Sequence, residues 1–522
     1  MTAEEAAGDA LAPGSLRRGR DGAAWRPRDA AHGGFPARRA RVSPSCRRLG
    51  HRDRSGAGIL RTEQGRGMVS DSAMRTGYGV DGAPDPSDAL PPEALPEGCH
   101  TVVVGVGDLN GILRGKRVTA QHWRSVRRRG IALDNTFFAM DVGSLLVPNA
   151  YSSADGGFPD LTIVPRGPLR PVPWEEGVWL CLGQAREKDG SPIPIDPRQP
   201  LLRAVARARD MGFEPRAAGE LEFYLLDDKT LRPREDRPEC YGLGRAAELE
   251  PVLGPIRRHL AEMGVPVEQS NPEFSAGQVE VNLRHAPALE AADHALLLRG
   301  MVKQIVRPHG LVASFMAKPF HDRSGNGFHV HHSLWRDGIN AFADQGGLSE
   351  TGRWFLGGIQ AAMRESSIVG STHPNAYRRR MNYSYAPITA SWGVDNRTVA
   401  LRVIEGEGPE DDPTVRMESR EAAADCNPYL LMAVQLASGL RGIAERIEPT
   451  RPTEGDAYAL ENRRPLPATL REAMEAAQGS TFLAETLGEP LVGLLIDNAA
   501  RELDVVEREV PPSELARYLE AM

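Results

Sequence analysis

The sequence predicts a mixed α/β protein built around a large central sheet. Beyond residue 199, segments typical of strands alternate with segments of helical periodicity, and no short internal repeat interrupts them. The composition is that of an ordinary globular protein, with 41% hydrophobic and 25% charged residues. At 522 residues, the chain is long enough to form two or three domains.

The first organised region has the pattern of a small β-rich unit. The sequence TVVVGV at 101–106 is typical of a strand, and turn residues follow it at 108–111. The glycines there do not have the spacing of a dinucleotide-binding loop, and no helix opens after them. We expect the unit to continue with a helix at 119–129 and with strands at 131–140, 160–164 and 178–185. The polar, proline-containing segment at 186–198 predicts a domain boundary.

The second region begins with an amphipathic helix. Leu201, Val205 and Ala208 fall on one face of the segment 199–211. The same reasoning predicts further helices at 245–263, 288–307, 349–366, 427–447 and within 467–521, with a loop at 449–465. The predicted strands lie at 217–226, 278–284, 312–317, 328–335, 386–392 and 398–404.

The N-terminal extension differs from the rest in charge. Residues 1–67 contain 14 arginines, no lysine and 7 acidic residues, whereas the whole chain has a net charge of −7. Few aliphatic residues are present to bury, so we expect residues 1–97 to be a disordered extension rich in Arg, Ala, Gly and Pro. A nucleic-acid-binding arm is the alternative, but Trp25 and Phe35 alone offer rings for base stacking among the 14 arginines of residues 1–67. A second alternative is that translation starts at Met68 or Met74.

Five widely spaced cysteines, odd in number and without a CxxC pair, are typical of reduced thiols in a cytoplasmic protein. The N-terminus lacks the pattern of a secretory signal. No apolar run approaches the roughly 20 residues that a membrane helix needs. We therefore expect a cytoplasmic protein with no membrane partner.

Six residues of metal-binding type occur in an order that suggests one site. Glu220 and Glu222 are two apart on a predicted strand, so their side chains point the same way. A solvated strand face would explain the alternation, but the following residues are apolar, and a buried carboxylate pair is costly without a counter-charge. Glu273 and Glu280 would face opposite ways on one continuous strand, whereas a turn at 275–277 lets them converge.

The remaining two ligands come from later strands. His329 alternates with His331 and Ser333 on one face of a strand that follows a glycine-rich turn, and Glu418 lies in RMESR. Five carboxylates and one imidazole could hold two divalent cations of the Mg²⁺ or Mn²⁺ kind.

Arginines accompany these ligands. Arg379, Arg397, Arg402 and Arg420 lie in NAYRRR, NRTVALR and MESR. The planar guanidinium donates two hydrogen bonds at once to phosphates and carboxylates, although each arginine alone could be a surface residue. Glu418 and Arg420 share a strand face, which places a metal-type ligand beside an anion binder. This pattern suggests phosphoryl transfer from ATP.

Six ordered motifs resemble the glutamine synthetase family, from about residue 98 to the C-terminus. They are GELEFYLL, EFSAGQVEVN, MAKPF with GNGFHVHHSLW, NAYRR, NRTVALR, and MESR with CNPYL. The resemblance implies an α+β fold with a small N-terminal β-grasp domain at 98–190. It also implies a large catalytic α/β domain at 195–522 with a mainly antiparallel sheet. Members form rings, usually dodecamers of two hexamers, with active sites between neighbouring subunits.

The resemblance also implies a role for each residue. Glu222, Glu273 and Glu280 would hold one metal, while Glu220, His329 and Glu418 would hold the other. His331 and Ser333 would lie beside the nucleotide, with Arg397 and Arg402 facing phosphates. Arg379, Arg420 and Gly325 would face glutamate. Asp141, in FFAMDVG, resembles the aspartate that a neighbouring subunit lends to the amine site. ATP would phosphorylate the γ-carboxylate of glutamate, and an amine would then displace phosphate.

Two positions depart from true glutamine synthetases, which have a flap glutamate where this chain has Tyr385, and an asparagine where it has Ser324. A neutral phenol is a poor partner for ammonium but suits an organic amine. We therefore expect the substrate to be an amine such as those used by the γ-glutamylpolyamine and γ-glutamylmonoamine ligases.

Three alternatives remain open from the sequence. The first is an ordinary glutamine synthetase that uses only ammonia. The second, of another class, is a catalytically silent structural or regulatory ring, which the full set of ligands disfavours. The third is a nucleic-acid-binding protein that acts through its basic extension.

Overall fold

The computed structural model describes residues 88–406, 414–460 and 464–521. The predictions for residues 1–87 lie outside these ranges. Residues just after Asp88 contact the first sheet and its helix. The Gly167 backbone in a strand donates to the Ala89 carbonyl at 2.7 Å, and in the helix at 120–129 Arg127 Nε donates to the Pro91 carbonyl at 2.5 Å and Trp123 Nε1 to the Pro92 carbonyl at 3.2 Å. The described chain is therefore packed against the first sheet before the predicted boundary at residue 98. Within the described ranges, we find no helix with the length and hydropathy needed to cross a membrane.

The small N-terminal unit is a five-stranded sheet with strand order β2-β1-β5-β4-β3. Strands β1 and β5 are parallel, and the other neighbours are antiparallel. Its elements are β1 (Thr101–Gly107), β2 (Leu113–Thr119), α1 (Ala120–Arg129), β3 (Ile131–Asp134), the 3₁₀ helix η2 (Asn135–Ala139), β4 (Asp160–Pro171) and β5 (Val178–Arg186).

The large sheet has ten strands, and its main path runs β15-β16-β17-β11-β6-β8-β7. All of its strand pairs are antiparallel except β15 with β16. Its strands are β6 (Glu214–Asp227), β7 (Val267–Pro272), β8 (Gln278–Leu283), β9 (Ala286–Pro287), β10 (Leu311–Ser314), β11 (Phe328–Arg336), β12 (Ile339–Asn340), β15 (Trp392–Val394), β16 (Leu401–Ile404) and β17 (Arg416–Ser419). A separate hairpin consists of β13 (Ala343–Asp344) and β14 (Gly347–Leu348).

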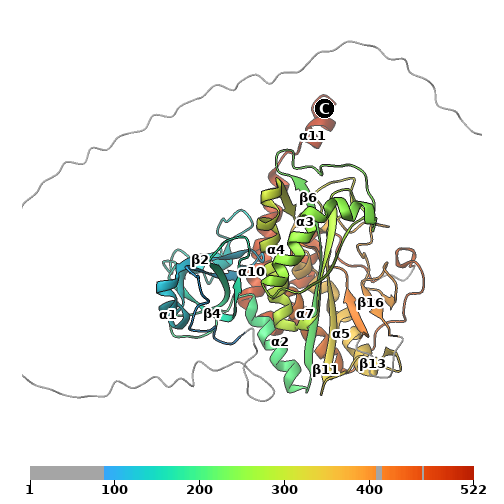
Figure 1. Cartoon of the computed structure of the whole chain (residues 1–522). Helices are drawn as coiled ribbons and strands as arrows, with labels where there is room; N and C mark the ends of the chain where they lie inside the picture. Colours follow the sequence, from blue (N-terminus) through green and yellow to red (C-terminus); the bar gives the residue numbers. More distant parts are fainter. Residues whose placement is uncertain (1–87, 407–413, 461–463, 522) are drawn as a thin grey trace, which may run out of the picture. The chain divides into compact units, whose positions relative to one another are not determined.

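Helices cover one face of the large sheet. In Figure 1, α2, α4 and α7 run along the long strands β6 and β11. His332 shows which side they cover, because its Nε2 lies 2.8 Å from Gln435 of α7 and its ring contacts Phe355 of α5. The neighbouring residues His329 and His331 therefore point to the opposite, open face. The helices of this part are α2 (Arg198–Asp210), α3 (Leu243–Glu262), α4 (Ala288–Ile305), α5 (Glu350–Gly370), α6 (Pro374–Tyr377), α7 (Pro428–Glu445), α8 (Leu470–Ala477), α9 (Thr481–Leu487), α10 (Glu489–Arg508) and α11 (Pro512–Tyr518).

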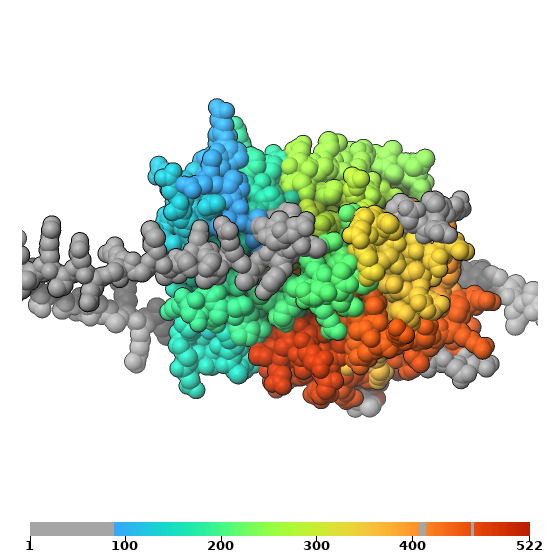
Figure 2. Space-filling view, turned by 90° about the horizontal axis from the view of Figure 1, so that it is seen from below, coloured from blue at the N-terminus to red at the C-terminus, as the bar shows by residue number. Residues whose placement is uncertain are grey.

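A buried arginine joins the small unit to the large one. Arg299 of α4 donates to the carbonyls of Asn110 at 2.6 Å and Cys426 at 2.5 Å, and also to that of Gly111. Asn427, the N-cap of α7, donates to the Asp108 carbonyl at 2.7 Å. Figure 2 shows the resulting surface, on which the blue and teal unit lies against the remainder without a break.

Two predicted strands are wrong in part, for local reasons. The strand expected at 131–140 ends at Asp134, whose side chain accepts a hydrogen bond from the Thr136 backbone at 3.1 Å and starts a 3₁₀ turn instead. The strand expected at 386–392 begins only at Trp392, and Pro387 in the preceding segment lacks a backbone donor. The strand expected at 160–164 continues to Pro171, and the other helices and strands that we predicted are present with ends shifted by a few residues.

Replacing Arg299 tests the contact between the units. Arg299→Met should lower the free energy of unfolding by about 3 kcal/mol, because several buried carbonyls lose their donor. Denaturant unfolding monitored by circular dichroism measures the change. Arg129→Met is the control, since its side chain is exposed and bonds to Ser125 of its own helix. Equal stability of the two variants would contradict this account.

Candidate active site

The open face of the large sheet forms the floor of a cavity of about 980 Å³. Strands β6, β8, β11, β16 and β17 supply most of its polar side chains. Of the predicted site residues, the following line it: Glu220, Glu222, Glu273, Glu280, Gly325, His329, His331, Ser333, Tyr385, Arg397, Arg402, Glu418 and Arg420.

Strand register brings the carboxylates together. Glu222 of β6 lies directly opposite Glu280 of β8, and Glu220 lies opposite His329 of β11. Glu418 of β17 pairs with His331 on one side and with Arg402 on the other. Partners opposite each other in a sheet project their side chains to the same face. Residues from five strands therefore meet on one surface.

The turn proposed between Glu273 and Glu280 is present. Strands β7 and β8 form an antiparallel pair, and the Glu273 backbone donates to the Gln278 carbonyl at 2.9 Å. Gly277 in the turn has φ +79°, a conformation that favours glycine. The chain reversal brings both carboxylates to the cavity.

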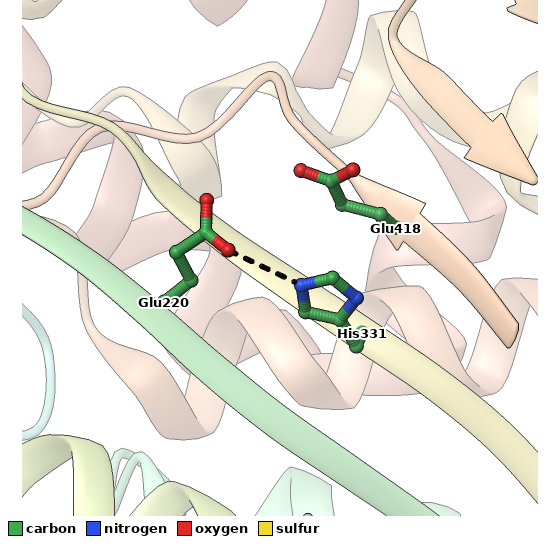
Figure 3. Close-up of side chains that lie close together, drawn as sticks. All are labelled: Glu220, His331 and Glu418. Atoms are coloured by element: carbon green, nitrogen blue, oxygen red, sulfur yellow. Dashed lines mark ion pairs between the residues drawn. The ribbon is translucent and has the colours of Figure 1, made fainter. Parts of the chain in front are cut away.

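Two histidines contact the acidic group. His329 Nδ1 lies 2.6 Å from Glu220 Oε1 and 3.3 Å from Glu418 Oε1, while its Nε2 lies 3.9 Å from Glu222. His331 Nε2 lies 3.5 Å from Glu220 Oε2 (Figure 3). One ligand atom from each of Glu220, His331 and Glu418 lies within 4.8 Å of the others, which is compatible with a shared metal ion.

A neighbouring arginine distinguishes the two imidazoles. Arg416 Nε lies 3.3 Å from Nδ1 of His331. A guanidinium can only donate, so this Nδ1 accepts and the ring proton is on Nε2, which faces Glu220. His331 in this tautomer has no free nitrogen for a metal. By the same reasoning, Nδ1 of His329 donates to the ionised Glu220, which leaves its Nε2, on the side of Glu222, free for a metal.

Arginines surround Glu418, which is buried. Arg402 Nη1 lies 3.1 Å from Glu418 Oε2, and Arg420 contacts Oε1. Burial raises the pKa of Glu418, but the charges of Arg420 and His329 outweigh it and lower that pKa overall. Burial likewise opposes ionisation of Glu220, and the charge and hydrogen bonds of His329 hold its pKa well below its usual range. These two carboxylates are ionised at neutral pH.

At Glu273 and Glu280, burial and neighbouring carboxylates outweigh any counter-charge. Burial and the charge of Glu222 raise the pKa of Glu273 to about 7. Burial, together with the charges of Glu220, Glu273 and Glu222, raises the pKa of Glu280 further. A hard divalent cation would relieve this repulsion, and the oxygen-rich donor set with one imidazole fits Mg²⁺ or Mn²⁺.

Two predicted site residues do not line the cavity. Arg379 is buried behind Gly325 and donates to the Ala422 carbonyl at 2.9 Å, while its Nε has no hydrogen-bond partner among the described residues. Asp141 accepts from Arg501 of α10 at 2.8 Å and caps its own loop through the Leu145 backbone.

The cavity includes residues that the sequence did not single out. Phe274 stacks on Tyr385, and Trp335 lies between Arg216 and His285. Asn282 donates to Glu220 Oε2 at 2.7 Å. Phe274 directly follows Glu273, and Trp335 continues the alternation of His329, His331 and Ser333, so both could have been found by extending those patterns.

The loop that presents Tyr385 has unusual backbone geometry. Tyr383 and Tyr385 have φ values of +62° and +58°, which L-residues rarely adopt. Ser384 Oγ donates to the Arg379 carbonyl at 2.8 Å, and the buried Tyr458 donates to the Ala386 carbonyl at 3.1 Å. These bonds fix the loop over the cavity.

The chain belongs to the glutamine synthetase family. The family described as glutamine synthetase, catalytic domain, matches residues 194–518. A glutamate–isopropylamine ligase of a Pseudomonas species is 34% identical over 80% of this chain and 95% of its own. A γ-glutamylethanolamide synthetase of Streptomyces coelicolor is 35% identical over 81% and 93%. Among solved structures, GmaS without ligand has a TM-score of 0.72 at 28% identity and covers 81% of this chain and 97% of that one.

These matches confirm the family predicted from the six motifs. They also establish a glutamine synthetase-like fold of mixed helix and sheet, and an enzyme of the ATP-dependent ligase type. ATP and a divalent metal are the cofactors expected throughout this family.

The raised carboxylate pKa values predict that metal binding depends on pH. Mn²⁺ binds ionised ligands, so its binding should release protons, and its affinity should rise by about tenfold per pH unit for each carboxyl proton released. The rise should continue above pH 7, because the pKa of Glu280 is raised further than that of Glu273. Calorimetry in buffers of different ionisation enthalpy measures both effects. Glu280→Gln should reduce the proton release, while Glu262→Gln on α3 should not. Affinity that is constant between pH 6 and 8 would contradict the prediction.

The same groups affect the metal-free fold. A carboxyl group whose pKa is raised by folding ionises at a lower pH in the unfolded chain than in the folded protein. The metal-free protein should therefore lose stability as pH rises from about 4.5 through about 7. Thermal unfolding in the presence of a chelator should show this loss, and Glu280→Gln should reduce it. A melting temperature that rises steadily over this pH range, in both proteins alike, would be the opposite result.

Gly325 tests the packing of the cavity wall. A Cβ there would lie 2.4 Å from Arg379 Cγ and 2.7 Å from the Ala317 carbonyl oxygen. Gly325→Ala should therefore displace Arg379 or the loop and lower kcat/KM at least about tenfold. Gly338→Ala, on a turn with open space around the new Cβ, is a control for expression and folding, although its φ of +81° makes it mildly strained. Unchanged kinetics in Gly325→Ala would show that this wall is not part of the site.

Proposed function

We propose that this chain is an ATP-dependent ligase that forms a γ-glutamyl amide from glutamate and an amine. The γ-carboxylate of glutamate attacks the γ-phosphorus of ATP, and ADP leaves. The amine nitrogen then attacks the acyl carbon, its C–N bond forms as the C–O bond to phosphate breaks, and the nitrogen loses a proton. The observation that carries the proposal is the convergence in one cavity of five carboxylates, two histidines and three arginines that the sequence had singled out.

Two metal sites are part of the proposal. Glu222, Glu273 and Glu280 would hold one Mg²⁺ or Mn²⁺, and Glu220, His329 and Glu418 the other. When bound, these ions neutralise and orient the triphosphate. The tautomer of His331 supports His329 as the ligand and leaves His331 and Ser333 for the nucleotide. Arg397 and Arg402 would bind phosphate oxygens.

Glutamate would lie against Gly325, near Arg379 and Arg420. Arg420 lines the cavity together with Gly325, and its guanidinium supports an anionic ligand at this position. Tyr385 would face the amine instead of the carboxylate that true glutamine synthetases use for ammonium. An organic amine suits this neutral aromatic surface better than ammonium does.

The proposed assembly is a ring of identical subunits, with two hexamers stacked as a dodecamer. Asp141 would then reach the amine site of a neighbouring subunit. Val142 and Leu145, close to Asp141 in sequence, are 50% and 57% exposed, as expected of an apolar surface that forms a subunit interface. We also propose that the five-stranded unit at 98–190 is of the β-grasp type, that the catalytic domain spans 195–522, and that the enzyme is cytoplasmic.

An amine panel tests the function. Phosphate release from ATP and glutamate should depend on an organic amine when ammonium, ethanolamine, isopropylamine, putrescine and spermine are compared. Strong activity with ammonium alone would instead support an ordinary glutamine synthetase. Binding of ATP and Mn²⁺ without turnover on any amine would support the silent ring.

One variant tests the metal ligands. Glu418→Gln should lower kcat by about 100-fold or more, because the carboxylate charge beside Arg402 and Arg420 is lost. Glu507→Gln, at an exposed ion pair with Arg471, is the matched control. Equal activity of both variants would refute the role given to Glu418.

A further inference from the structure

Two aromatic rings form an exposed pair at the cavity. Phe274 and Tyr385 stack with ring centroids 5.4 Å apart and an interplanar angle of 24°. Both line the cavity, yet 53% of Phe274 and 49% of Tyr385 remain exposed. Large apolar side chains exposed inside a cavity are typical of a surface that binds an apolar group.

Both rings are held in place before any ligand binds. The Phe274 backbone donates to Glu273 Oε2 at 3.2 Å, and the Ser324 backbone donates to Ser275 Oγ at 2.8 Å in the same turn. On the other side, Ser384 and Tyr458 fix the loop of Tyr385. A preorganised pair loses little side-chain entropy when a ligand binds.

No spare carboxylate lines the cavity near this pair. Apart from the five proposed metal ligands, Glu268 is the one acidic residue among the described lining residues. Its charge acts on His285 and Arg416, beside Trp335 and His331, and not on the aromatic pair. The five carboxylate ligands would have their charge neutralised by metal, and the Asp141 that we propose a neighbouring subunit supplies would face the reacting amine nitrogen. A second ammonium group would therefore find no free counter-charge there.

Resting on the proposed ligase function, we infer that Phe274 and Tyr385 bind the carbon chain of the amine. The preferred substrate is a primary monoamine with a short uncharged tail, and not a diamine or polyamine. Contact with the exposed ring faces favours carbon, whereas a charged tail would lose hydration for weak cation–π contact alone.

Amines that share one four-carbon skeleton and differ in the tail separate a preference for an uncharged tail from a preference for a second ammonium group. The values of kcat/KM for n-butylamine and 4-aminobutanol should exceed that for putrescine at least about tenfold. Putrescine equal to or better than n-butylamine would overturn this inference and leave the ligase function intact. Absence of phosphate release with every amine, ammonium included, would overturn the ligase function itself.

A variant tests the aromatic pair directly. Phe274→Ala should lower the ratio of kcat/KM for n-butylamine to that for methylamine by about tenfold, because the longer chain loses its contact surface. Tyr385→Phe keeps both rings and should keep the ratio. Ile339→Ala removes a side chain that is also 53% exposed but lies outside the cavity lining, and it should leave the ratio unchanged.

Binding of Mn²⁺ to each variant, measured by calorimetry, detects any displacement of the adjacent Glu273. Phe274→Ala with normal Mn²⁺ affinity and an unchanged ratio would overturn the assignment. If Phe274→Ala lowers the Mn²⁺ affinity, Phe274→Leu, which retains an apolar side chain, takes its place in the comparison. An unchanged ratio of n-butylamine to methylamine kcat/KM in Phe274→Leu would also overturn the assignment.

Discussion

Repulsion between carboxylates on one face of the central sheet is the constraint on which the rest of this site depends. Glu222 and Glu280 lie directly opposite each other, and the charges of Glu220 and Glu273 also raise the pKa of Glu280. Like charges at such positions destabilise a sheet, and burial adds to the cost. A fold that keeps this arrangement needs cations, and among the described residues the shortest contacts of arginine and histidine side chains with the cluster are to Glu418 and Glu220.

This asymmetry divides the cavity into two functional ends. Around Glu418 and Glu220, arginines and imidazoles keep the carboxylates ionised and offer donors to phosphate oxygens. Around Glu273 and Glu280, the lining includes the aromatic residues Phe274, Tyr385 and Tyr241, and the charge of Arg397 also acts on Tyr241. The proposed chemistry follows from this division, because phosphoryl transfer needs the cationic end while an amine with a carbon tail suits the aromatic end.

The sequence predicted the acidic set because alternation on a strand fixes which side chains share a face. It also predicted the turn that lets Glu273 and Glu280 converge. Register between distant strands could not be read from the sequence, so the contact of His331 with Arg416 and the stacking of Phe274 on Tyr385 appear only in the structure. The short strands at 392–394 and 416–419 depend on tertiary pairing, which outweighs local propensity. Asp141 stays a prediction, since its proposed role needs a neighbouring subunit.

Anomalous diffraction from crystals grown with Mn²⁺ and a non-hydrolysable ATP analogue tests the central claim most directly. We expect two manganese peaks in the cavity, one ligated by Glu222, Glu273 and Glu280 and the other by Glu220, His329 and Glu418. The triphosphate should lie between the second ion and the arginines. A cavity without manganese, or carboxylates turned away from the ions, would contradict the account.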